Sequence, residues 1–295
     1  MKLTIYTPTY NRRDLLKRVY QSLQRQTNKN FIWLIIDDGS NDGTEKLVKE
    51  WINTEKVFLI KYIKKKNEGV HSARDVAYDA CETELIFSVD SDDWLIDNAV
   101  EKIMNHWENI ENTNYAGIFA RSIFIDEDDS FNKFPKIFSA TYQEFTYKYK
   151  YKRDKETILR ADIIKKIPKS PIYNNEKLVG ESYKWIQLPN DKPFLVIQEP
   201  VTYTERQNEG YTKNAYNVVF KNPNGFRANY KQHIISSVFI EPKIKGYLGY
   251  IYCSLILKDK NFINSSPNPL ITLLLFPLGV LSYFYIILRS KYIKI

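Results

Sequence analysis

Short apolar runs alternate with amphipathic segments along the first 120 residues of the chain. The apolar runs are continuous, as is typical of strands that are buried on both faces. The segments between them carry apolar residues at helical spacing. We expect strands at 3–7, 32–36, 57–63 and 85–89, and helices at 15–23, from Thr44, at 72–81 and from Asp97. This alternation with short connections predicts right-handed βαβ units and therefore a Rossmann-like α/β fold, in which helices flank a mostly parallel sheet.

Beyond about residue 115 the pattern is less regular. A strand is expected at 116–125, and the stretch 126–160 is charged, aromatic and irregular. The other expected elements are helices at 160–167 and 181–188, strands at 194–197 and 201–205, and a mainly helical region at 212–260. The segment 270–288 is apolar throughout. The sequence therefore predicts an α/β part followed by a helical C-terminal part.

Three polar clusters follow the expected strands, at 9–11, 37–40 and 90–93. In open parallel sheets, ligands bind beyond the carboxyl ends of the strands. About fifty residues or fewer separate one cluster from the next, so we expect all three to converge on one crevice.

The chain has 295 residues, enough for one sizeable core with an appendage or for two small domains. Cys81 and Cys253 stand alone, so neither a disulfide framework nor a structural zinc site is expected. The first residues enter a strand pattern without a secretory signal, and we expect a reduced, cytosolic environment.

The net charge is +8, and two stretches, 64–66 and 147–153, are strongly basic. The second alternates Tyr with Lys, a pattern that could follow a nucleic acid or contact an anionic membrane surface. An exposed edge strand or hairpin has the same alternation, and we adopt that interpretation. No nucleic-acid partner is therefore expected.

The strongest chemical signal is the acidic segment 90–93. Carboxylates at Asp90 and Asp92, two positions apart after a buried strand, can both reach one hard divalent cation. Mg²⁺ and Mn²⁺ favour such oxygen ligands and readily bridge them to diphosphate oxygens. The competing interpretation is a solvated turn before a helix that Asp97 caps. The preceding strand and the other two clusters favour the metal–diphosphate site.

Two further residues are candidate binding groups, although each is a weak signal alone. Asp38 could accept a hydrogen bond from a pyrimidine N–H or a ribose hydroxyl, while Gly39 permits a tight turn. Arg74 could donate to a base carbonyl or a phosphate through its planar guanidinium, or form a structural salt bridge. His71 has no second histidine or cysteine at ligand spacing, so we do not expect it to bind a metal.

Four motifs in this order resemble those of glycosyltransferase family 2. They are Thr7-Pro8-Thr9-Tyr10-Asn11-Arg12, Ile36-Asp37-Asp38-Gly39-Ser40, Asn67-x-Gly69-x-x-x-Ala73-Arg74 and Asp90-Ser91-Asp92-Asp93. The resemblance is firm over 1–110 and weaker to about 215. It implies a GT-A fold and transfer of a sugar from a nucleotide donor.

The resemblance also implies a role for each matching residue. Thr9 and Tyr10 would line the pocket of the nucleotide base, with the Tyr10 ring stacked on it. Asp38 would bind a uracil-like edge, and Arg74 would reach the base or the phosphates. Asp90 and Asp92 would form the DxD element, which binds the nucleotide and a divalent cation, Mn²⁺ or Mg²⁺, with Asp92 nearest the ion.

Members of this family usually carry a catalytic acidic residue, often in a Glu-Asp pair, about 90 residues after the DxD element. The matching segment here is Val179-Gly180-Glu181-Ser182-Tyr183-x-Trp185, in which Ser182 replaces the second acid. Glu181 is therefore the expected catalytic base, with Glu176 and Asp191 as reserves. The competing interpretation is that Glu181 is simply an acid that stabilises a helix N-terminus. A second departure is Asp75, where the family often has Asn.

The implied reaction is a single displacement at the anomeric carbon of the sugar, with inversion. A carboxylate base takes the proton of the acceptor hydroxyl, and a bridging cation neutralises the leaving diphosphate. No covalent nucleophile is needed.

The apolar segment 270–288 contains 19 residues without a charge, about 28 Å as a helix. We expect Pro277 and Gly279 to break its middle. Basic residues follow the segment, which favours a cytoplasmic location for this end. A broken, interfacial or re-entrant segment on the cytoplasmic face of the bacterial inner membrane agrees with both features. A true span and a buried or oligomer-forming helix are the alternatives.

These features predict three regions and one leading function. The regions are a GT-A domain at 1–215, a helical extension at 216–268 and a membrane-associating segment with a basic tail at 269–295. The leading function is a hexosyl- or N-acetylhexosaminyltransferase that uses a nucleotide sugar, here a UDP-sugar, to extend a glycan or lipid-linked acceptor of a bacterial surface polysaccharide.

Two other functions compete with this one. A non-catalytic nucleotide-sugar-binding or scaffolding protein of the same fold remains open because Ser182 replaces an acid. Nucleotidyl transfer is disfavoured, since no Gly-rich, basic triphosphate loop appears near the N-terminus.

Overall fold

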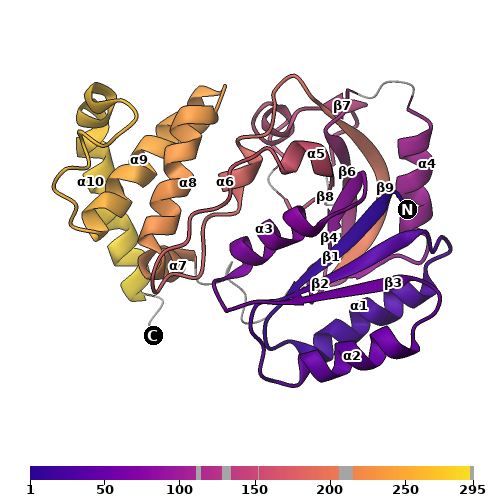
Figure 1. Ribbon diagram of the computed structural model, residues 1–295. Helices are drawn as coiled ribbons and strands as arrows, with labels where there is room; N and C mark the ends of the chain where they lie inside the picture. The colour runs from indigo at the N-terminus through magenta and orange to yellow at the C-terminus, as the bar shows by residue number, and fades with distance from the viewer. Residues whose placement is uncertain (111–113, 128–133, 152, 206–214, 293–295) are drawn as a thin grey trace. The chain divides into compact units, whose positions relative to one another are not determined.

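The computed structural model describes residues 1–110, 114–127, 134–151, 153–205 and 215–292. The chain forms two compact units (Figure 1). Unit 1 comprises Met1–Pro168 and Leu188–Gln207, and unit 2 comprises Lys169–Gln187 and Asn208–Ile295. The segment 169–187, which carries Glu181, thus belongs with the C-terminal helices. The three regions proposed from the sequence divide the chain differently and stay a prediction.

Unit 1 is built on a nine-stranded sheet whose main order is β3-β2-β1-β4-β8-β6-β9-β5, with β7 paired to β9. Its strands are β1 (Leu3–Thr9), β2 (Phe31–Asp37), β3 (Leu59–Lys64), β4 (Leu85–Ser88), β5 (Trp94–Leu95), β6 (Gly117–Phe124), β7 (Ser139–Ala140), β8 (Glu156–Arg160) and β9 (Phe194–Thr204). Strands β1 to β4 pair in parallel, which confirms the predicted βαβ units. Strand β8 is antiparallel to both of its neighbours, so the sheet as a whole is mixed.

Helices cover both faces of the parallel half of the sheet (Figure 1). They are α1 (Arg13–Arg25), α2 (Thr44–Thr54), α3 (Val70–Ala80) and α4 (Ala99–Glu108), followed later by α5 (Ala161–Ile164). On one face Trp33 of β2 stacks with Tyr20 of α1, whose ring in turn lies 4.4 Å from that of Trp51 in α2. On the other face Tyr6 of β1 meets Tyr78 of α3 edge to face. Both faces of β1 and β2 are therefore buried, and polar groups occur where these strands end.

The second half of unit 1 differs from expectation in two places. The described residues of the basic stretch, 147–151 and 153, do not form an edge strand or hairpin, so that interpretation was wrong. Glu144–Lys148 form a π-helical turn instead, and Tyr151 packs on Phe145 in an aromatic cluster. The two strands expected at 194–197 and 201–205 are one strand, β9. Its pairing with β6 is irregular around Pro200, which is how the strand accommodates a proline.

Unit 2 consists of α6 (Ser182–Trp185), α7 (Ala215–Lys221), α8 (Pro223–Ser236), α9 (Ile240–Ile256) and α10 (Pro269–Tyr292). Its helices meet at glycines. A Cβ atom on Gly249 of α9 would lie 2.4 Å from the Tyr230 ring of α8, and one on Gly279 of α10 would lie 2.4 Å from Ile251 of α9. These glycines let the helix backbones approach closely.

The expected break at Pro277 and Gly279 was wrong, because α10 is one continuous helix that contains both. Gly279 is the point at which α10 packs on α9. Among the described residues, α10 alone is long and apolar enough to cross a membrane, over Pro269–Ser290, and 17% of its most apolar stretch is buried. Length and composition by themselves do not assign the helix to a membrane.

The short helix α6 is joined to α8 by two side chains. The Ser182 hydroxyl donates to Asn229 Oδ1 at 3.1 Å and lies 2.8 Å from His233 Nε2. Because Ser182 has one hydroxyl proton and gives it to Asn229, the His233 ring donates to the Ser182 oxygen through Nε2–H. Burial lowers the pKa of His233 from 6.5 to about 4, which agrees with a neutral ring.

Unit 2 should therefore lose stability as the pH falls from 6.5 towards 4. The folded state must take up a proton on a buried ring, whereas the unfolded state takes it up freely, so the contribution of His233 is complete above its unfolded pKa. The loss amounts to at most about 3 kcal/mol. Thermal unfolding measured between pH 7 and pH 4.5 should show the decline.

His233→Gln removes the titrating ring and should flatten this pH dependence. His106→Gln is the matched control, since His106 is an exposed histidine of α4 and its replacement should leave the pH dependence unchanged. If His233→Gln retains the full decline, another group is responsible.

Candidate active site

The structure brings the three polar clusters to the same edge of the sheet. Thr9 and Asp37 are register partners at the ends of β1 and β2, and the Asp38 amide donates to the Thr9 carbonyl at 2.9 Å. The Asn11 amide donates to Ser40 Oγ, also at 2.9 Å. Strand β4, which leads into 90–93, pairs with the other side of β1. The convergence predicted from strand order therefore holds in the fold of unit 1.

Each of the two candidate metal ligands faces a guanidinium group. Asp92 Oδ2 lies 3.1 Å from Arg12 Nη1, and Asp90 Oδ2 lies 3.7 Å from Arg74 Nη2. The two arginines come from the β1–α1 connection and from α3, so the pairs join separate segments of the chain. Alternating acids and arginines could bind a cation and a diphosphate together, since carboxylates suit the cation and guanidiniums suit phosphate oxygens.

A divalent cation fits this donor set only if another molecule supplies part of its coordination. Within the described ranges, no group of three or more His, Cys, Asp or Glu side chains is placed to hold a metal ion. Mg²⁺ commonly takes one or two protein carboxylates together with substrate phosphates and water. Asp90 and Asp92 fit that pattern, with the diphosphate of a nucleotide completing the site.

Arg18 of α1 holds the acidic turn in place. Its Nη2 donates to the Asp92 carbonyl at 2.8 Å, and its guanidinium lies 4.1 Å from the centre of the Trp94 ring. The same group forms an ion pair with Glu205 at 2.7 Å. Sequence reasoning assigned no function to Arg12 or Arg18, although Arg12 lies within one of the quoted motifs.

Asp93 differs from its acidic neighbours because its carboxyl group is largely buried. Burial, and then the nearby charges of Glu156, Asp90 and Asp92, raise the pKa of Asp93 to about 9. At neutral pH Asp93 is therefore protonated and adds no negative charge to the turn. Sequence reasoning assigned no separate function to Asp93, because its burial and its closeness to Glu156 on the unpredicted strand β8 arise only in the fold.

Asp38 is buried, and its carboxylate already accepts three hydrogen bonds. Oδ1 accepts from Lys65 Nζ at 2.9 Å and from the Glu68 amide at 3.0 Å, and Oδ2 accepts from the Gly69 amide at 2.7 Å. Asp38 thus fixes the loop that leads into α3 and Arg74. A carboxylate has about four acceptor positions, so one remains for a ligand. Its predicted contact with a base stays a prediction.

Thr9 and Tyr10 differ in exposure. The Thr9 hydroxyl is buried and has no hydrogen-bond partner within the described part of the chain. Tyr10 is 48% exposed at the same edge and presents an aromatic face on which a base could stack. Their placement beside 37–40 agrees with the proposed base pocket.

Two of the three candidate bases belong to unit 2. Glu181 is exposed and directly precedes α6 in unit 2. Glu176 is buried, and its carboxylate accepts from the backbone amides of Asn224 and Gly225 at the start of α8. It therefore caps a helix and cannot readily serve as a base. Asp191 is exposed in a turn of unit 1.

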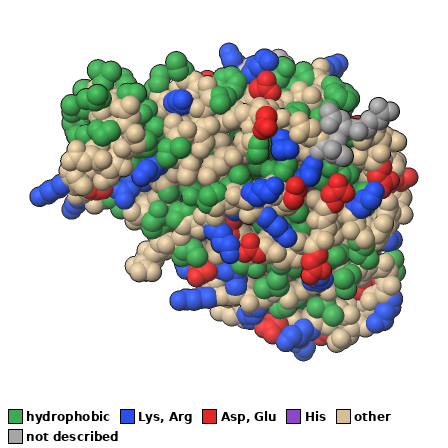
Figure 2. Space-filling view, turned by 45° about the horizontal axis from the view of Figure 1, so that its top comes forward, with side chains coloured by type: hydrophobic (Ala, Val, Ile, Leu, Met, Phe, Trp, Pro, Cys, Tyr) green, Lys and Arg blue, Asp and Glu red, His purple; other side chains and the backbone are tan. Residues whose placement is uncertain are grey.

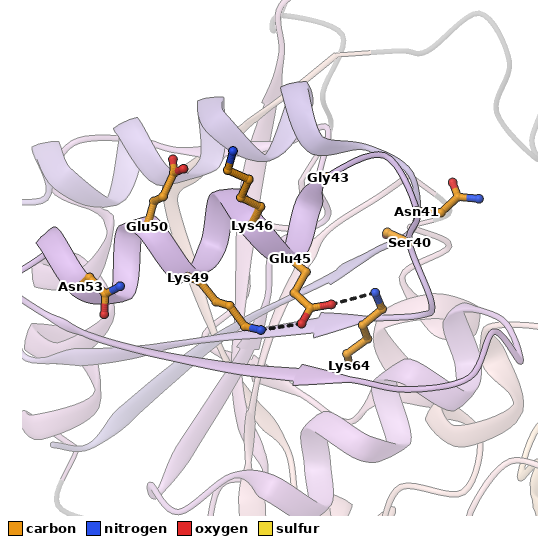
Figure 3. Close-up of a pocket in the computed structure, with 9 residues that line it drawn as sticks. All are labelled: Ser40, Asn41, Gly43, Glu45, Lys46, Lys49, Glu50, Asn53 and Lys64. Carbon is orange, nitrogen blue, oxygen red and sulfur yellow. Dashed lines mark hydrogen bonds and ion pairs between the residues drawn. The ribbon is translucent and has the colours of Figure 1, made fainter.

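A hollow of about 580 Å³ lies over the β2–α2 connection and α2 (Figure 3), and Ser40 of the 37–40 cluster is among its lining residues. Glu45 lies within it and pairs with Lys49 at 2.6 Å and with Lys64 at 2.9 Å. Neither the acidic turn nor Arg74 lines this hollow, so it does not coincide with the candidate active site.

Comparison with curated proteins gives partial matches to glycosyltransferases. "GalNAc(5)-diNAcBac-PP-undecaprenol beta-1,3-glucosyltransferase" of Campylobacter jejuni is 27% identical over 74% of this chain and 70% of its own length. "Glycosyltransferase GlyA" of Streptococcus pneumoniae is 32% identical over 39% of this chain, and the match spans only 17% of that protein.

Solved structures with the same fold include two nucleotide-sugar complexes. S. aureus TarS 1–349 with UDP-GlcNAc matches with a TM-score of 0.59 and 17% identity, covering 89% of this chain and 75% of the other. The mannosyltransferase PcManGT of Pyrobaculum calidifontis, with GDP-Man and Mn²⁺, matches with a TM-score of 0.55 and 13% identity over 98% and 83% of the two chains. At these identities the likeness shows the fold alone, which is GT-A.

The family profile described as glycosyl transferase family 2 matches residues 4–167, more than half of the chain. These residues include all three clusters at the sheet edge, together with Arg12 and Arg74. The chain therefore belongs to glycosyl transferase family 2.

Proposed function

We propose that this protein is an inverting hexosyl- or N-acetylhexosaminyltransferase that uses a UDP-sugar to extend a glycan or lipid-linked acceptor of a bacterial surface polysaccharide. The observation that carries the proposal is the pairing of Asp90 with Arg74 and of Asp92 with Arg12 at the edge of the sheet. This arrangement has separate groups for a divalent cation and for the diphosphate of the donor.

A uridine donor is supported by chemistry near the ends of β1 and β2. The exposed Tyr10 ring, the buried Thr9 hydroxyl and the remaining acceptor position of Asp38 form a set that suits a planar base with an N–H group. One neighbour of the same fold binds UDP-GlcNAc, whereas another binds GDP-Man. The fold therefore does not select the base, and the local side chains carry this part of the proposal.

The reaction is a single displacement. The acceptor hydroxyl oxygen attacks the anomeric carbon and forms the new glycosidic bond, while its proton passes to the Glu181 carboxylate. The bond between the anomeric carbon and the diphosphate oxygen breaks, and its electron pair leaves with the diphosphate. Arg12 and Arg74 bind phosphate oxygens, and Asp90 and Asp92 would hold Mn²⁺ or Mg²⁺, which neutralises charge on the leaving group.

One relative supports the proposed acceptor, and helix α10 supports the proposed location at the membrane. The Campylobacter jejuni relative is named for an undecaprenol-linked substrate, which supports a lipid-linked acceptor on the cytoplasmic face of the inner membrane. Helix α10 has a highly exposed apolar side that could enter a membrane surface, formed by Leu270, Leu273, Leu274, Leu278, Leu281, Phe284 and Leu288. Its opposite side packs on α9, which favours monotopic or peripheral attachment.

Replacing Asp92 with Asn should abolish metal-dependent turnover. A neutral amide cannot offset the charge of the cation, and the loss should reach about a hundredfold or more. The rate of nucleoside diphosphate release with Mn²⁺ and a suitable acceptor measures this effect.

Asp97→Asn is the control. Asp97 is an exposed acid that follows the acidic turn closely in sequence, and its carboxylate pairs with Arg25. Its turnover should stay close to wild type. Near-normal, metal-dependent transfer by Asp92→Asn would disprove the metal-binding role of Asp92.

Glu181→Gln should lower kcat by about 10² to 10⁴ while the affinity for the nucleotide sugar stays almost unchanged. Gln preserves the size of the side chain but cannot accept the acceptor proton. Thermal shift with the nucleotide sugar measures donor binding, and single-turnover kinetics measures the transfer step.

Glu176→Gln and Asp191→Asn are the parallel variants. Glu176→Gln should reduce the stability of unit 2, since it weakens the cap of α8, and retain its turnover below the melting temperature. Transfer within a few-fold of wild type by Glu181→Gln, together with an inactive Asp191→Asn, would place the base at Asp191.

Membrane association can be tested without unfolding α10. The triple variant Leu274→Glu, Leu278→Glu, Leu281→Glu changes only exposed side chains and leaves the side that packs on α9 intact. It should move the protein from the membrane fraction to the soluble fraction, because burying three carboxylates at an interface is costly.

Val57→Glu and Leu59→Glu provide the matched control, since both residues are exposed apolar residues of unit 1. That variant should distribute like the wild type. Retention of the α10 variant in the membrane fraction would show that this side of α10 does not attach the protein.

A further inference from the structure

One end of the helical bundle in unit 2 contains an apolar pocket of about 590 Å³. The pocket lies where the C-terminal end of α8 meets the N-terminal ends of α9 and α10. Aliphatic and aromatic side chains line most of it, among them Ile234, Ile244, Tyr247, Ile271 and Leu275. The lining is therefore suited to a hydrocarbon chain rather than to a sugar or a nucleotide.

Lys243 brings a positive charge to this apolar lining. The side chain is half-buried and forms no ion pair with any residue that the structure describes. Its neighbour Lys245 pairs with Glu241, and Arg227 pairs with Asp259. Lys243 is thus a cation without a counterion at the edge of an apolar pocket, where an anionic group would find little competition from water.

The surface around the pocket is apolar and exposed. Ile240 is 77% exposed and Leu270 is 80% exposed, and Ile235 and Val238 add to the same end of the bundle. Figure 2 shows hydrophobic side chains gathered over the helices of unit 2, at the left of the view. Soluble monomers rarely expose a large continuous patch of this kind, so the patch indicates a binding surface.

The charge of the region identifies the kind of partner. Residues 215–268 contain seven Lys or Arg and two Asp or Glu, so this part of unit 2 is strongly basic. A basic region with an apolar end complements a molecule that has a negative head and a hydrocarbon tail. A protein partner would leave Lys243 in need of a specific acid, whereas every anionic phospholipid carries a phosphate next to its chains.

We propose that this end of unit 2 enters the membrane surface and binds one anionic phospholipid, with an acyl chain in the pocket and the phosphate at Lys243. The site includes the ends of α8 and α9 and so extends beyond the exposed side of α10. The proposal rests on the membrane association proposed above but is independent of the transferase chemistry.

The test uses the full chain and vesicles of phosphatidylcholine with or without 30% phosphatidylglycerol, and binding is measured by co-sedimentation. A lysine that is merely near an anionic surface contributes about fivefold to binding. Lys243→Met retains most of the apolar stem and should weaken binding to the anionic vesicles by tenfold or more. Lys243→Arg keeps the positive charge and should bind the anionic vesicles about as tightly as the wild type.

Lys260→Met is the matched control, because Lys260 is an exposed lysine of the same unit outside the pocket. It should reduce binding by no more than about fivefold. Equal losses for Lys243→Met and Lys260→Met would overturn the phosphate site and leave only general charge attraction. Failure of the wild type to bind either vesicle would overturn membrane association itself.

A second measurement reports on the pocket directly. Ile240→Trp places a fluorophore at the pocket mouth. Lipids brominated in their acyl chains should quench this variant more than the wild type, whose five tryptophans give the background, if the mouth lies among those chains. Absence of quenching in vesicle-bound protein, or concentration-dependent dimerisation that hides Ile240→Trp from an aqueous quencher, would overturn the proposal.

Discussion

Strands β1 and β2 are buried on both faces along their whole length, and this constraint shapes the rest of unit 1. Each strand has seven consecutive buried residues, so neither can present a polar side chain to a ligand from its middle. Chemistry is possible only where the strands end, and there the parallel arrangement brings the first residues of several loops together. The acids and arginines of the candidate active site consequently come from different segments of the chain: Arg12 from the β1–α1 connection, Arg74 from α3, and Asp90 and Asp92 from the turn after β4.

Such a concentration of acids requires compensation, and the structure provides it in three ways. Arg12 and Arg74 lie opposite Asp92 and Asp90, Lys65 lies opposite Asp38, and Asp93 carries a proton. Asp90, Asp92 and Asp38 therefore each have a cationic side chain beside them. In the proposed function, the cation would meet the carboxylates and the diphosphate would meet the guanidinium groups, so each would find groups of the opposite sign.

The parts of this fold that could be predicted from the sequence are those in which one hydrophobic pattern dominates. The parallel strands could be predicted from their apolar runs, and the meeting of residues 9–11, 37–40 and 90–93 at one edge of the sheet could be predicted from the order of the strands. Strand β8 could not be predicted, because a five-residue strand inside a charged and irregular stretch shows no distinctive spacing of apolar residues. The continuity of α10 was missed because Pro277 is a helix breaker in isolation, whereas packing on α9 stabilises the helix around it. The function of Asp38 in holding the loop at 65–69 depends on a long-range contact that no local motif reveals.

The glycine contacts of unit 2 form a series with a mechanical meaning. Gly279 lies on Ile251, Gly249 lies on the Tyr230 ring, and Gly180 lies on the Asn229 side chain, each so closely that an added Cβ would fall 2.4 to 2.5 Å from its neighbour. Contacts this tight leave no empty space between the neighbouring segments at these points. Close backbone packing therefore runs from α10 through α9 and α8 to the turn that carries Glu181, and a larger residue at any of the three glycines would force two of these segments apart.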